Sequence, residues 1–549
     1  MRILLYCDDP GYGGTAVNAG LLAVGLAGDG RTIGLAAAAD LRSGREDIAF
    51  VPLDYDTQRL RTKTLTSRNE PDAALLTFRP QLVLFCDSAP DANLAAKAVC
   101  LDWGLPYVAV VNYAAPNQAA ALDPPVRAAV TRTLGAALAV VSVSSENLAL
   151  LRQDYGVPAG RSGVIYNGRP EAWFAPPEPD RCAARRRELG LGPDDALFLT
   201  VARYEPRKGY RHLIAAARAV WDAPLPRRPV FVWIGQSLDD GEEQVRRAVA
   251  GLEARVAVLG ERADVRDWMG AADAFLLPSE SEGMPLCLIE AMGQGLPVVA
   301  SNVSGIPELL GGTGILLPDP GRDAVAATAA LAWSVAALAA DATLCHALGQ
   351  AGRERAQTFF TARSMLTAYA ALLRSLEPAV AGPGPDWDTL AAAPPAHLAP
   401  VGRDIAWGRD TCCLEYLKEG WSEGEDTGRW TVGDRARLVL ALPPSLRAGF
   451  VLAFEATAFL GADDTGEVTV AVTVNDRPAG RVCWTGPAVA RWVELAVTTP
   501  DGTDRAEVVL TIDGASSPAA HKLSDDTRRL GLRLLRLRLD PLPRAGVTA

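Results

Sequence analysis

Residues 278–310, PSESEGMPLCLIEAMGQGLPVVASNVSGIPELL, decide how the rest of the chain is interpreted. A loop of small and acidic residues, Pro278–Gly283, leads into a helix predicted from about Leu286 to Gln294. A short buried strand is predicted at Pro297–Ser301, and Pro307-Glu308 begins another helix. A helix that starts directly after a glycine-containing loop presents free backbone N–H groups and the positive end of its dipole, which suits a phosphate.

Two carboxylates flank this predicted anion site. Glu282 lies in the loop, and Glu290 lies one to two turns into the helix, where side chains lean back toward the N-terminus. Carboxylates repel a phosphate, but they accept hydrogen bonds from hydroxyl groups on either side of it. A nucleotide-sugar has this arrangement of ribose, diphosphate and hexose. Two solvated acids in an unrelated α/β protein are the alternative interpretation.

The stretch resembles the signature of retaining glycosyltransferases of the GT-B fold, of the family 4 type (glycosyl transferases group 1). The resemblance rests on SEGMPLCLIEAM and on the strings GLPVVAS and GIPELL that follow it. It implies a catalytic role for Glu282 and donor binding by Gly283, Met284, Leu286 and Glu290. Where the family often has Gly-Phe-Gly, this chain has Gly-Met-Pro, whose proline has no N–H. This departure bears on the donor hexose, and less on the fold.

The N-terminus has the order strand, loop, helix. Arg2–Cys7 is a continuous apolar run typical of a central parallel strand, Asp8–Thr15 is rich in glycine, and a helix is predicted from about Val17 to Ala27. This arrangement cradles phosphates in many proteins, and a plain tight turn is the equal alternative. The family resemblance implies that Gly13 and Gly14 face the donor diphosphate and the acceptor across a cleft.

Further apolar runs alternate with helical patterns, which indicates a doubly wound parallel sheet. These runs are Ile48–Pro52, Leu82–Cys86, Tyr107–Val111 and Ala139–Val143. Gly163–Gly168 resembles the crossover between the two halves of the family, and a helix at Thr361–Ser375 is expected to return toward the first half. The sequence therefore predicts an α/β fold with two Rossmann-like domains, residues 1–170 on the acceptor side and residues 171–378 on the nucleotide-sugar side.

The second predicted domain places cations at the end of its first strand. Leu197–Val201 is followed by ARYEPRKG, and ligands bind at the carboxyl ends of such strands. Arginine offers a fork to phosphate oxygens, and lysine a point charge. By resemblance, Arg203 and Lys208 neutralise the leaving diphosphate, and Arg262 lies where the nucleotide base packs. A solvated loop is the alternative. Glu205 either holds Arg203 in place or is simply exposed.

The last part of the chain changes character. Residues 379–400 are rich in Pro, Ala and Gly and are predicted to be a linker. Residues 401–543 contain short, often alternating runs separated by turns, which predicts an antiparallel β-sandwich. The strings GWSE and GRW within 420–430 resemble the opening of a sandwich domain appended to some bacterial glycosyltransferases. Trp421 and Trp430 are candidates for a carbohydrate platform, but packing into the sandwich or onto its neighbour is the favoured interpretation.

Length and composition bound the possibilities. A chain of 549 residues is too long for one core, and about three domains are expected. The net charge of −11 argues against nucleic acid as a partner. The nine scattered cysteines form no C-x-x-C, which argues against structural zinc and fits a reducing cytoplasm. The start, MRILLYCDDP, is too short and too acidic for a signal peptide. Ala324–Ala340 is dominated by alanine and is expected to be a buried helix rather than a membrane span.

The predicted chemistry needs no cofactor and no metal. Retaining transfer requires charge stabilisation on a departing diphosphate, which Arg203, Lys208 and helix N-termini supply. Asp54-Tyr-Asp56 has the D-x-D pattern that binds metal in the other glycosyltransferase fold, and is given little weight. No histidine precedes His212, so Asn112 is the nearest polar candidate for facing the sugar from the first domain.

The sequence therefore predicts a bacterial glycosyltransferase (a hexosyltransferase) that moves a sugar, with retention, from a nucleotide-sugar to a glycan or lipid-linked acceptor in surface or extracellular polysaccharide synthesis. The expected location is the cytoplasm, at the inner face of the membrane. Whether the protein makes a peripheral contact with the membrane is left open. Two alternatives remain: a GT-B enzyme of another type, such as an epimerase, and a non-catalytic sugar-binding or scaffold protein acting through the β-sandwich. The base, the donor sugar, the acceptor and the oligomeric state are not predicted.

Overall fold

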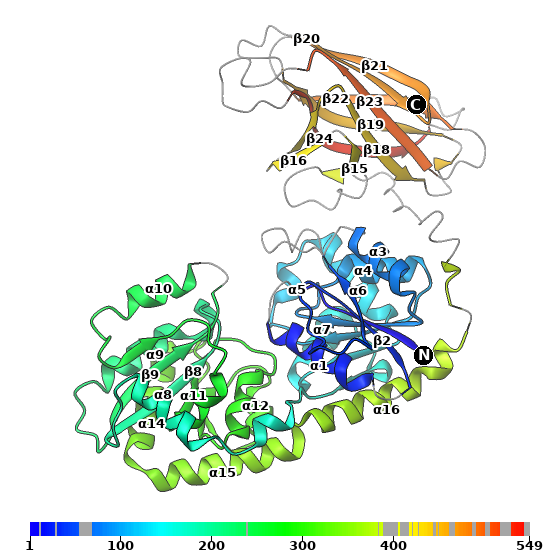
Figure 1. The fold of residues 1–549 in the computed structure, drawn as a ribbon. Coiled ribbons are helices and arrows are strands. Elements are labelled where there is room, and N and C mark those ends of the chain that lie inside the picture. The colour runs from blue at the N-terminus through cyan, green and yellow to red at the C-terminus, as the bar shows by residue number, and fades with distance from the viewer. Residues whose placement is uncertain are drawn as a thin grey trace. The chain divides into compact units, whose positions relative to one another are not determined.

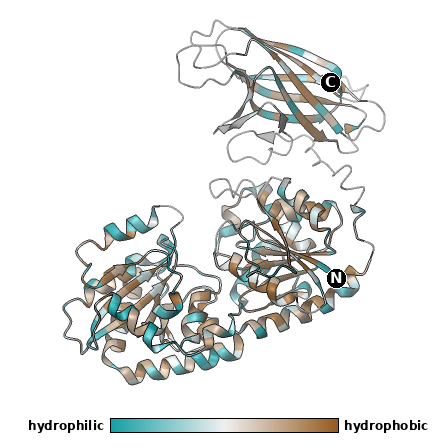
Figure 2. Cartoon of the chain, in the orientation of Figure 1, coloured by the Kyte–Doolittle hydropathy of each residue, from teal (hydrophilic) through white to brown (hydrophobic). Residues whose placement is uncertain are grey.

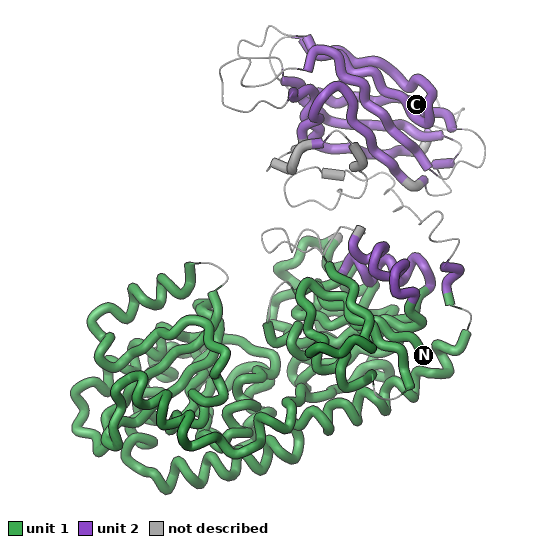
Figure 3. Tube along the Cα trace, viewed as in Figure 1, with its two compact units in different colours: residues 1–53, 80–93, 105–384 green, residues 54–79, 94–104, 385–549 purple. Residues whose placement is uncertain are grey.

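A computed structural model of the chain describes most of its residues. The described ranges are 1–9, 13–27, 30–53, 69–237, 240–382, 384–387, 405–406, 417–419, 421–425, 428–442, 446–447, 449–459, 467–485, 490–499, 505–515 and 529–542. Asp54-Tyr-Asp56 and most of the predicted linker lie outside them. Figure 3 shows two compact units, one of residues 1–53, 80–93 and 105–384, the other of residues 54–79, 94–104 and 385–549. The first unit holds two parallel sheets and the second holds two antiparallel sheets.

The first parallel sheet has seven strands in the order β3-β2-β1-β4-β5-β6-β7 (Figure 1). They are β1 (Arg2–Tyr6), β2 (Thr32–Ala37), β3 (Ala49–Pro52), β4 (Leu82–Asp87), β5 (Tyr107–Val111), β6 (Ala139–Ser142) and β7 (Ser162–Val164). Most of their residues are buried, as apolar runs in a sheet covered on both faces must be. The strand order reverses at β1 and β4, and ligands bind in parallel sheets at such a switch point.

The helices of this half follow the strands in alternation. They are α1 (Gly14–Leu26), α3 (Asn69–Phe78), α4 (Leu94–Asp102), α5 (Gln118–Ala121), α6 (Pro124–Ala136) and α7 (Ser145–Tyr155). The side-chain hydroxyl of Ser144 accepts a hydrogen bond from the backbone N–H of Asn147 at 3.3 Å and so caps α7. Helix α1 begins at Gly14, so the backbone N–H groups of its first turn have no carbonyl partner within the helix.

The second parallel sheet has six strands in the order β10-β9-β8-β11-β12-β13. They are β8 (Asp195–Val201), β9 (Arg228–Ile234), β10 (Val256–Val258), β11 (Ala274–Leu277), β12 (Val298–Ser301) and β13 (Ile315–Leu317). The helices are α8 (Pro179–Glu188), α9 (Tyr210–Ala219), α10 (Gly241–Ala248), α11 (Val265–Ala271), α12 (Leu286–Gly293), α13 (Ile306–Leu310), α14 (Ala324–Ala340) and α15 (Ala342–Phe359). The switch point here lies between β8 and β11, which carry ARYEPRKG and the acidic loop at their carboxyl ends.

The last helix of the α/β part, α16 (Ala362–Val380), returns to the first sheet, as the sequence predicted. Met365, Tyr369 and Leu373 share one apolar core with residues of β1 and α1. In α1, the space where a side chain of Gly25 would lie is filled by Leu366. The chain thus crosses between the halves twice, and the two crossings pair as a β-bridge between Arg169 and Thr361.

The C-terminal part is a β-sandwich, as predicted from the alternating runs. One sheet has the order β16-β17-β24-β19-β22 with β14 paired to β24, and the other has the order β15-β18-β23-β20-β21. The strands are β14 (Ile405–Ala406), β15 (Leu417–Glu419), β16 (Trp421–Glu425), β17 (Gly428–Val432), β18 (Arg435–Ala441), β19 (Gly449–Ala458), β20 (Glu467–Val474), β21 (Arg477–Thr485), β22 (Arg491–Thr498), β23 (Arg505–Asp513) and β24 (Leu530–Pro541). Side chains of both sheets form one apolar core.

The two tryptophans considered as a carbohydrate platform pack against the sandwich itself. Trp421 is half-buried against the sandwich core, and its indole N–H donates to the backbone carbonyl of Arg437 at 3.0 Å. Trp430 is also half-buried, and its ring contacts that of Phe459 edge-on, with centroids 6.1 Å apart. These contacts agree with the favoured interpretation of structural packing.

Helix α14 departs from the prediction of a buried helix. Leu331, Val335 and Leu338 are buried, but Val325 is 81% exposed and Trp333 is 69% exposed. Figure 2 shows mostly brown strands in both parallel sheets, whereas α10 is largely teal. Within the described residues, no single helix has the length and apolar character of a membrane span; α14 and α15 reach that threshold only together, across a bend of 107°.

We propose residues 1–170, 171–378 and 401–543 as the domain limits.

Candidate active site

The carboxyl ends of β8 and β11 bring together the two charged loops that the sequence singled out. β8 and β11 are neighbours in the sheet, so the segments that leave them run side by side. The backbone N–H of Glu280 in the acidic loop donates to the carbonyl of Arg207 at 2.8 Å. Gly209 makes this approach possible: its φ is +78°, and an added Cβ would lie 1.9 Å from the carbonyl oxygen of Pro278. The loops therefore meet directly, without space for a side chain.

Lys208 and Glu282 form a buried ion pair at the centre of this junction. The ammonium Nζ of Lys208 lies 2.6 Å from Oε1 of Glu282, and the two side chains are 12% and 6% exposed. Ser279 donates its hydroxyl to the same Oε1 at 2.8 Å, and the backbone N–H of Glu282 donates to the hydroxyl of Ser304 at 3.2 Å. Burial raises the pKa of the Glu282 carboxyl, but the charges of Lys208 and Arg207 outweigh it, so the pKa lies below its ordinary value. The carboxylate is therefore ionised at neutral pH.

Arg203, in the same loop as Lys208, is held by Glu205. Nη1 of Arg203 lies 2.8 Å from Oε1 of Glu205, and Nε of Arg207 lies 2.8 Å from Oε2 of the same carboxylate. Arg207 also donates to the backbone carbonyl of Ser281 at 3.2 Å. Glu205 thus bridges two arginines and orients Arg203, which answers the question that the sequence left open. The guanidinium of Arg203 stays 38% exposed.

Gly14, the first residue of α1, lies against the start of α12. A Cβ added to Gly14 would meet the side chain of Leu286 at 3.5 Å, whereas one added to Gly13 would meet the carboxylate of Asp9 at 2.8 Å. The predicted site residues Gly14 and Leu286 are therefore brought together across the two halves. Gly13 is the N-cap of α1, and its carbonyl accepts the first helical hydrogen bond, from Val17 at 3.0 Å.

Gly283 and Met284 hold the two halves in direct contact. A Cβ added to Gly283 would lie 1.9 Å from the backbone carbonyl oxygen of Asn112, so only glycine fits there. Met284 is buried, and its backbone carbonyl accepts a hydrogen bond from the side-chain amide of Asn167 at 3.4 Å. Asn112, the candidate sugar-facing residue, donates its own side-chain amide to the carbonyl of Asp87 at 3.1 Å.

Glu308 ties α13 to the first half, a role that the sequence did not suggest. Its carboxylate accepts hydrogen bonds from the backbone N–H and hydroxyl of Ser145, at 2.7 and 2.8 Å, and from the hydroxyl of Tyr166 at 2.7 Å. Because Ser145 opens α7, this carboxylate interacts with the positive end of that helix. Burial and the hydrogen bond to Glu308 raise the pKa of the Tyr166 phenol to about 12, so the phenol remains a donor.

Glu290, the second predicted hydroxyl-binding acid, is buried and paired with an arginine. Its Oε1 lies 2.7 Å from Nη2 of Arg169, and the two side chains are 11% and 9% exposed. The guanidinium of Arg169 also lies over the ring of Trp173, 5.5 Å from its centroid. Burial raises the pKa of the Glu290 carboxyl, and the charge of Arg169 opposes that rise without cancelling it. Arg169 follows the predicted crossover Gly163–Gly168, and its position as a lone cation after an uncharged turn is the signal that was missed.

Arg262 belongs to a separate network of ion pairs. Its guanidinium binds both carboxylate oxygens of Asp264, at 2.8 and 2.7 Å, and contacts Glu188 at 3.0 Å. The guanidinium carbon also lies 5.6 Å from the ring centroid of Trp268. The hydrogen bonds to Asp264 and Glu188 raise the pKa of Arg262. Among the described residues, no hydrogen bond or ion pair joins this network to Lys208 and Glu282.

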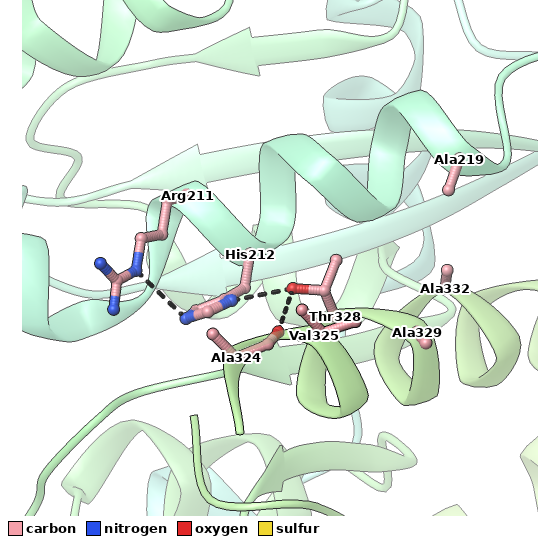
Figure 4. Close-up of a pocket in the computed structure, with 8 residues that line it drawn as sticks. All are labelled: Arg211, His212, Ala219, Ala324, Val325, Thr328, Ala329 and Ala332. Atoms are coloured by element: carbon pink, nitrogen blue, oxygen red, sulfur yellow. Dashed lines mark hydrogen bonds between the residues drawn. The ribbon is translucent and has the colours of Figure 1, made fainter. Parts of the chain in front are cut away.

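A histidine behind the acidic loop links α9 to α14 (Figure 4). Nδ1 of His212 lies 2.9 Å from the hydroxyl of Thr328, and its Nε2 lies 3.3 Å from Nε of Arg211. Arg211 in turn pairs with Glu280 of the acidic loop at 2.5 Å. A pocket of about 620 Å³ lies between the helices, and four of the eight residues drawn in Figure 4 as its lining are alanines. His212 thus supports the junction of the two loops from behind.

The stability of this region is expected to depend on pH through His212. Burial, and secondly the charge of Arg211, lower the pKa of the imidazole below its ordinary value. The unfolded chain therefore takes up a proton first, and stability is lost as the pH falls below about 6.5. The melting temperature of the α/β part should drop less between pH 7.5 and 5.5 in His212→Gln than in the wild type. His346→Gln, at an exposed position of α15, is the matched control and should behave like the wild type.

Comparison with known proteins agrees with this architecture. Residues 12–172 match the family described as Glycosyltransferase Family 4, and residues 195–336 match the family described as Glycosyl transferases group 1. The chain is 33% identical over 230 residues to alpha-maltose-1-phosphate synthase of Mycolicibacterium smegmatis, covering 40% of this chain and 58% of that protein. It is 34% identical over 230 residues to D-inositol 3-phosphate glycosyltransferase of Kribbella flavida, covering 39% and 52%. The matched region therefore spans little more than half of these relatives.

Solved structures resemble the α/β part in fold. The structure of HepE of Anabaena in complex with UDP and glucose superposes with a TM-score of 0.58 at 20% identity, covering 68% of this chain and all of that one. Sucrose-phosphate synthase of Thermosynechococcus elongatus gives a TM-score of 0.57 at 22% identity, covering 69% and all of that chain. These likenesses show that the α/β part has the GT-B fold. Within that part, the first half is similar to the Glycosyltransferase Family 4 model and the second half to the glycosyl transferases group 1 model.

Proposed function

We propose that the chain is a retaining glycosyltransferase that moves a hexose from a nucleotide-sugar to a glycan or lipid-linked acceptor. The observation that carries this proposal is the buried pair of Lys208 and Glu282 at the carboxyl ends of β8 and β11. A buried cation and a buried carboxylate side by side match a ligand that has an anionic diphosphate next to a hydroxyl-rich sugar. Helix α1 begins opposite this site, with Gly14 facing Leu286.

In the proposed mechanism, the cationic side chains of Arg203 and Lys208 bind the leaving diphosphate. Arg203, oriented by Glu205, offers a planar fork to phosphate oxygens, and Lys208 offers a point charge. Both charges are in place before the bond to the sugar breaks, so they stabilise the negative charge that develops on the departing oxygen. This arrangement supplies the charge stabilisation without a metal. Gly13 and Gly14 at the start of α1 add N–H groups near the same diphosphate.

The carboxylates are assigned to the sugars on either side of the diphosphate. Glu282, ionised at neutral pH, accepts hydrogen bonds from hexose hydroxyls once Lys208 turns to the phosphate. The backbone of Gly283 and Met284, with Leu286 at the start of α12, forms the floor beneath the hexose. Oε1 of Glu290 is occupied by Arg169, so its Oε2 is the oxygen assigned to the ribose. Arg262 is assigned to the edge of the base, in keeping with the resemblance.

The names of two further relatives support the pathway that we propose. One is described as a lipopolysaccharide core biosynthesis mannosyltransferase of Rhizobium meliloti, 32% identical over 165 residues. Another is an Escherichia coli galactosyltransferase whose described acceptor is a sugar-diphosphoundecaprenol, 30% identical over 171 residues. We therefore propose a role in bacterial surface or extracellular polysaccharide synthesis. The enzyme would act in the cytoplasm, at the inner face of the membrane where lipid-linked acceptors are held.

Nucleotide-dependent stability tests the donor site. At about 100 times its dissociation constant, one of UDP, GDP or ADP, or the corresponding nucleotide-sugar, should stabilise the α/β part by roughly 2.7 kcal/mol. Arg203→Gln should reduce this gain, because it removes a guanidinium that the proposal places at the diphosphate. Arg203 is partly exposed, so we expect the substitution to leave the fold intact. The exposed Arg218→Gln on α9 is the matched control and should keep the full gain. If none of the nucleotides changes the melting temperature, the donor site is refuted.

Turnover separates transfer from the alternatives. With the nucleotide that binds, a glycosyltransferase should form a glycoside whose anomeric configuration, read by NMR, equals that of the donor. An epimerase would change the donor sugar without an acceptor. A non-catalytic protein would give no turnover, and its glycan binding would survive Glu282→Gln. An inverted product would contradict the retaining mechanism.

A further inference from the structure

The outer face of one sheet of the β-sandwich carries a polar groove. Along β20, Val468, Val470 and Val472 point into the sandwich core, so Thr469 and Ala471 lie on the opposite face. In the ladder, Ala471 pairs with Arg481 of β21 on one side and with Thr511 of β23 on the other, and Thr469 pairs with Asp513. Small side chains therefore form a floor, with longer charged side chains next to it.

This groove has the size of a ligand site. Its volume is about 500 Å³, within the range of roughly 300–1,000 Å³ that is usual for ligand pockets. From Asp434, next to β18, to Arg481 on β21, it crosses three strand spacings, roughly 14 Å at about 4.8 Å each. Its lining residues are Asp434, Thr469, Ala471, Arg481, Thr511, Ile512, Asp513, Gly514 and Arg529.

One wall of the groove is held in place before any ligand binds. Nη2 of Arg529 lies 2.9 Å from Oδ1 of Asp434, and Nη1 lies 3.2 Å from Oδ2, which makes a two-pronged ion pair. The backbones are fixed as well, because Gly433 donates to the carbonyl of Arg529 and Ile512 donates to that of Asp434, both at 2.8 Å. A wall held in this way loses little freedom when a ligand binds.

The opposite side offers groups that are available to a ligand. Arg481 and Asp513 are exposed, and no hydrogen bond or ion pair joins either side chain to another residue that the structure describes. At the floor, the hydroxyl of Thr469 is buried, and its hydrogen bond to Oε1 of Glu467 is long, at 3.3 Å. Beside the paired Arg529 and Asp434, the groove therefore presents the fork of Arg481 as a donor, the carboxylate of Asp513 as an acceptor, and threonine hydroxyls that act as both.

The chemistry of the lining selects the class of ligand. Among the described lining residues, the charges of two arginines and two aspartates balance, so these residues lack the excess positive charge that a nucleic acid or another polyanion requires. Among the lining residues that the structure describes, none is aromatic or a methionine, whereas the cores of protein interfaces are enriched in both. We infer that this groove binds a neutral, hydroxyl-rich ligand, a stretch of uncharged glycan chain, at a site separate from the transfer site.

The inference is tested on the full chain with labelled neutral oligosaccharides as probes. Gluco-, manno- and galacto-hexasaccharides are titrated into the wild type and into Arg481→Gln and Asp513→Asn. Arg477→Gln, on the same strand, and Asp476→Asn, in the turn before it, are the matched controls, since both are exposed and outside the lining. At least one neutral hexasaccharide should bind to the wild type with little dependence on salt. Its Kd should rise about tenfold or more in the two groove variants and stay unchanged in the two controls.

Further arms separate this site from the transfer site and from other ligands. Binding of the hexasaccharide should persist in Lys208→Ala and in the presence of saturating nucleotide, so that loss of transfer activity and loss of groove binding are independent results. No binding of any neutral hexasaccharide, or an equal loss in the groove variants and their controls, would overturn the inference. Binding restricted to an acidic oligogalacturonate and abolished by salt would overturn it as well, because the ligand would then be a polyanion.

Discussion

Replacing Lys208 with alanine is expected to lower kcat by about 100- to 1,000-fold, the range observed when a single group that stabilises transition-state charge is removed. The ammonium group is the cation nearest to Glu282, at 2.6 Å, and the proposed mechanism needs it at the departing diphosphate. Initial rates with the nucleotide-sugar that binds provide the measurement. Arg211→Gln, on the next turn and 60% exposed, is a control that should change the rate far less.

The same substitution leaves Glu282 buried without its main partner, so a second variant is needed to separate folding from catalysis. Lys208→Ala combined with Glu282→Gln removes the unpaired charge and should recover much of any lost stability. Activity should remain low in the double variant, because neither group is restored. An activity within about tenfold of the wild type in either variant would contradict the role proposed for Lys208.

Replacing Glu290 with alanine is expected to destabilise the α/β part by about 3–5 kcal/mol, the usual cost of breaking a buried ion pair on one side. The substitution leaves the guanidinium of Arg169 buried without its carboxylate, at the crossing between the two halves. Urea unfolding, followed by circular dichroism, measures the change. Glu308→Ala, by contrast, removes a carboxylate that accepts hydrogen bonds at the start of a helix, and it should destabilise the α/β part by less than Glu290→Ala does.

A double substitution shows whether the pair or the unpaired charge matters. Arg169→Met with Glu290→Leu replaces both charges with apolar groups of similar volume and should be more stable than Glu290→Ala alone. The raised pKa of Glu290 points the same way, since burial outweighs the attraction of Arg169. If Glu290→Ala cost less than about 1 kcal/mol, the pair would contribute little to the fold and the expectation would be wrong.

The fold could be predicted from the sequence wherever strands are strongly apolar. Leu82–Cys86 and Tyr107–Val111 became central strands because unbroken runs of large apolar residues fit a doubly covered sheet. The strand Thr32–Ala37 was not predicted, since its glycine and alanines lack that signal, and Ile315–Leu317 was missed because it is so short. Helix α14 was predicted correctly as a helix, but alanine occurs on both of its faces and does not indicate which one is buried.

The candidate site could be predicted in part. Lys208 and Glu282 each follow an apolar strand, and adjacent parallel strands bring their carboxyl ends together. The proximity of the two residues could therefore be predicted from the sequence pattern. The partner of Glu290 could not be found in this way, because Arg169 lies in a crossover and no periodicity connects the two. The pairing of Arg262 with Glu188 was not predicted either, since Glu188 ends a helix remote in the chain and charged side chains pair according to tertiary packing.

Because Gly283 contacts Asn112 so closely, the residue at position 283 of a related sequence indicates how its two halves are joined. A Cβ at 283 would lie 1.9 Å from a main-chain oxygen of the other half, and a main-chain atom cannot rotate away as a side chain can. A related chain with alanine or a larger residue there must join its two halves in a different geometry, whatever the rest of its acidic loop resembles. The residue at position 283 thus distinguishes homologues by how their two halves are joined. The residues at positions 208 and 282 distinguish them by whether the charged pair proposed for catalysis is kept.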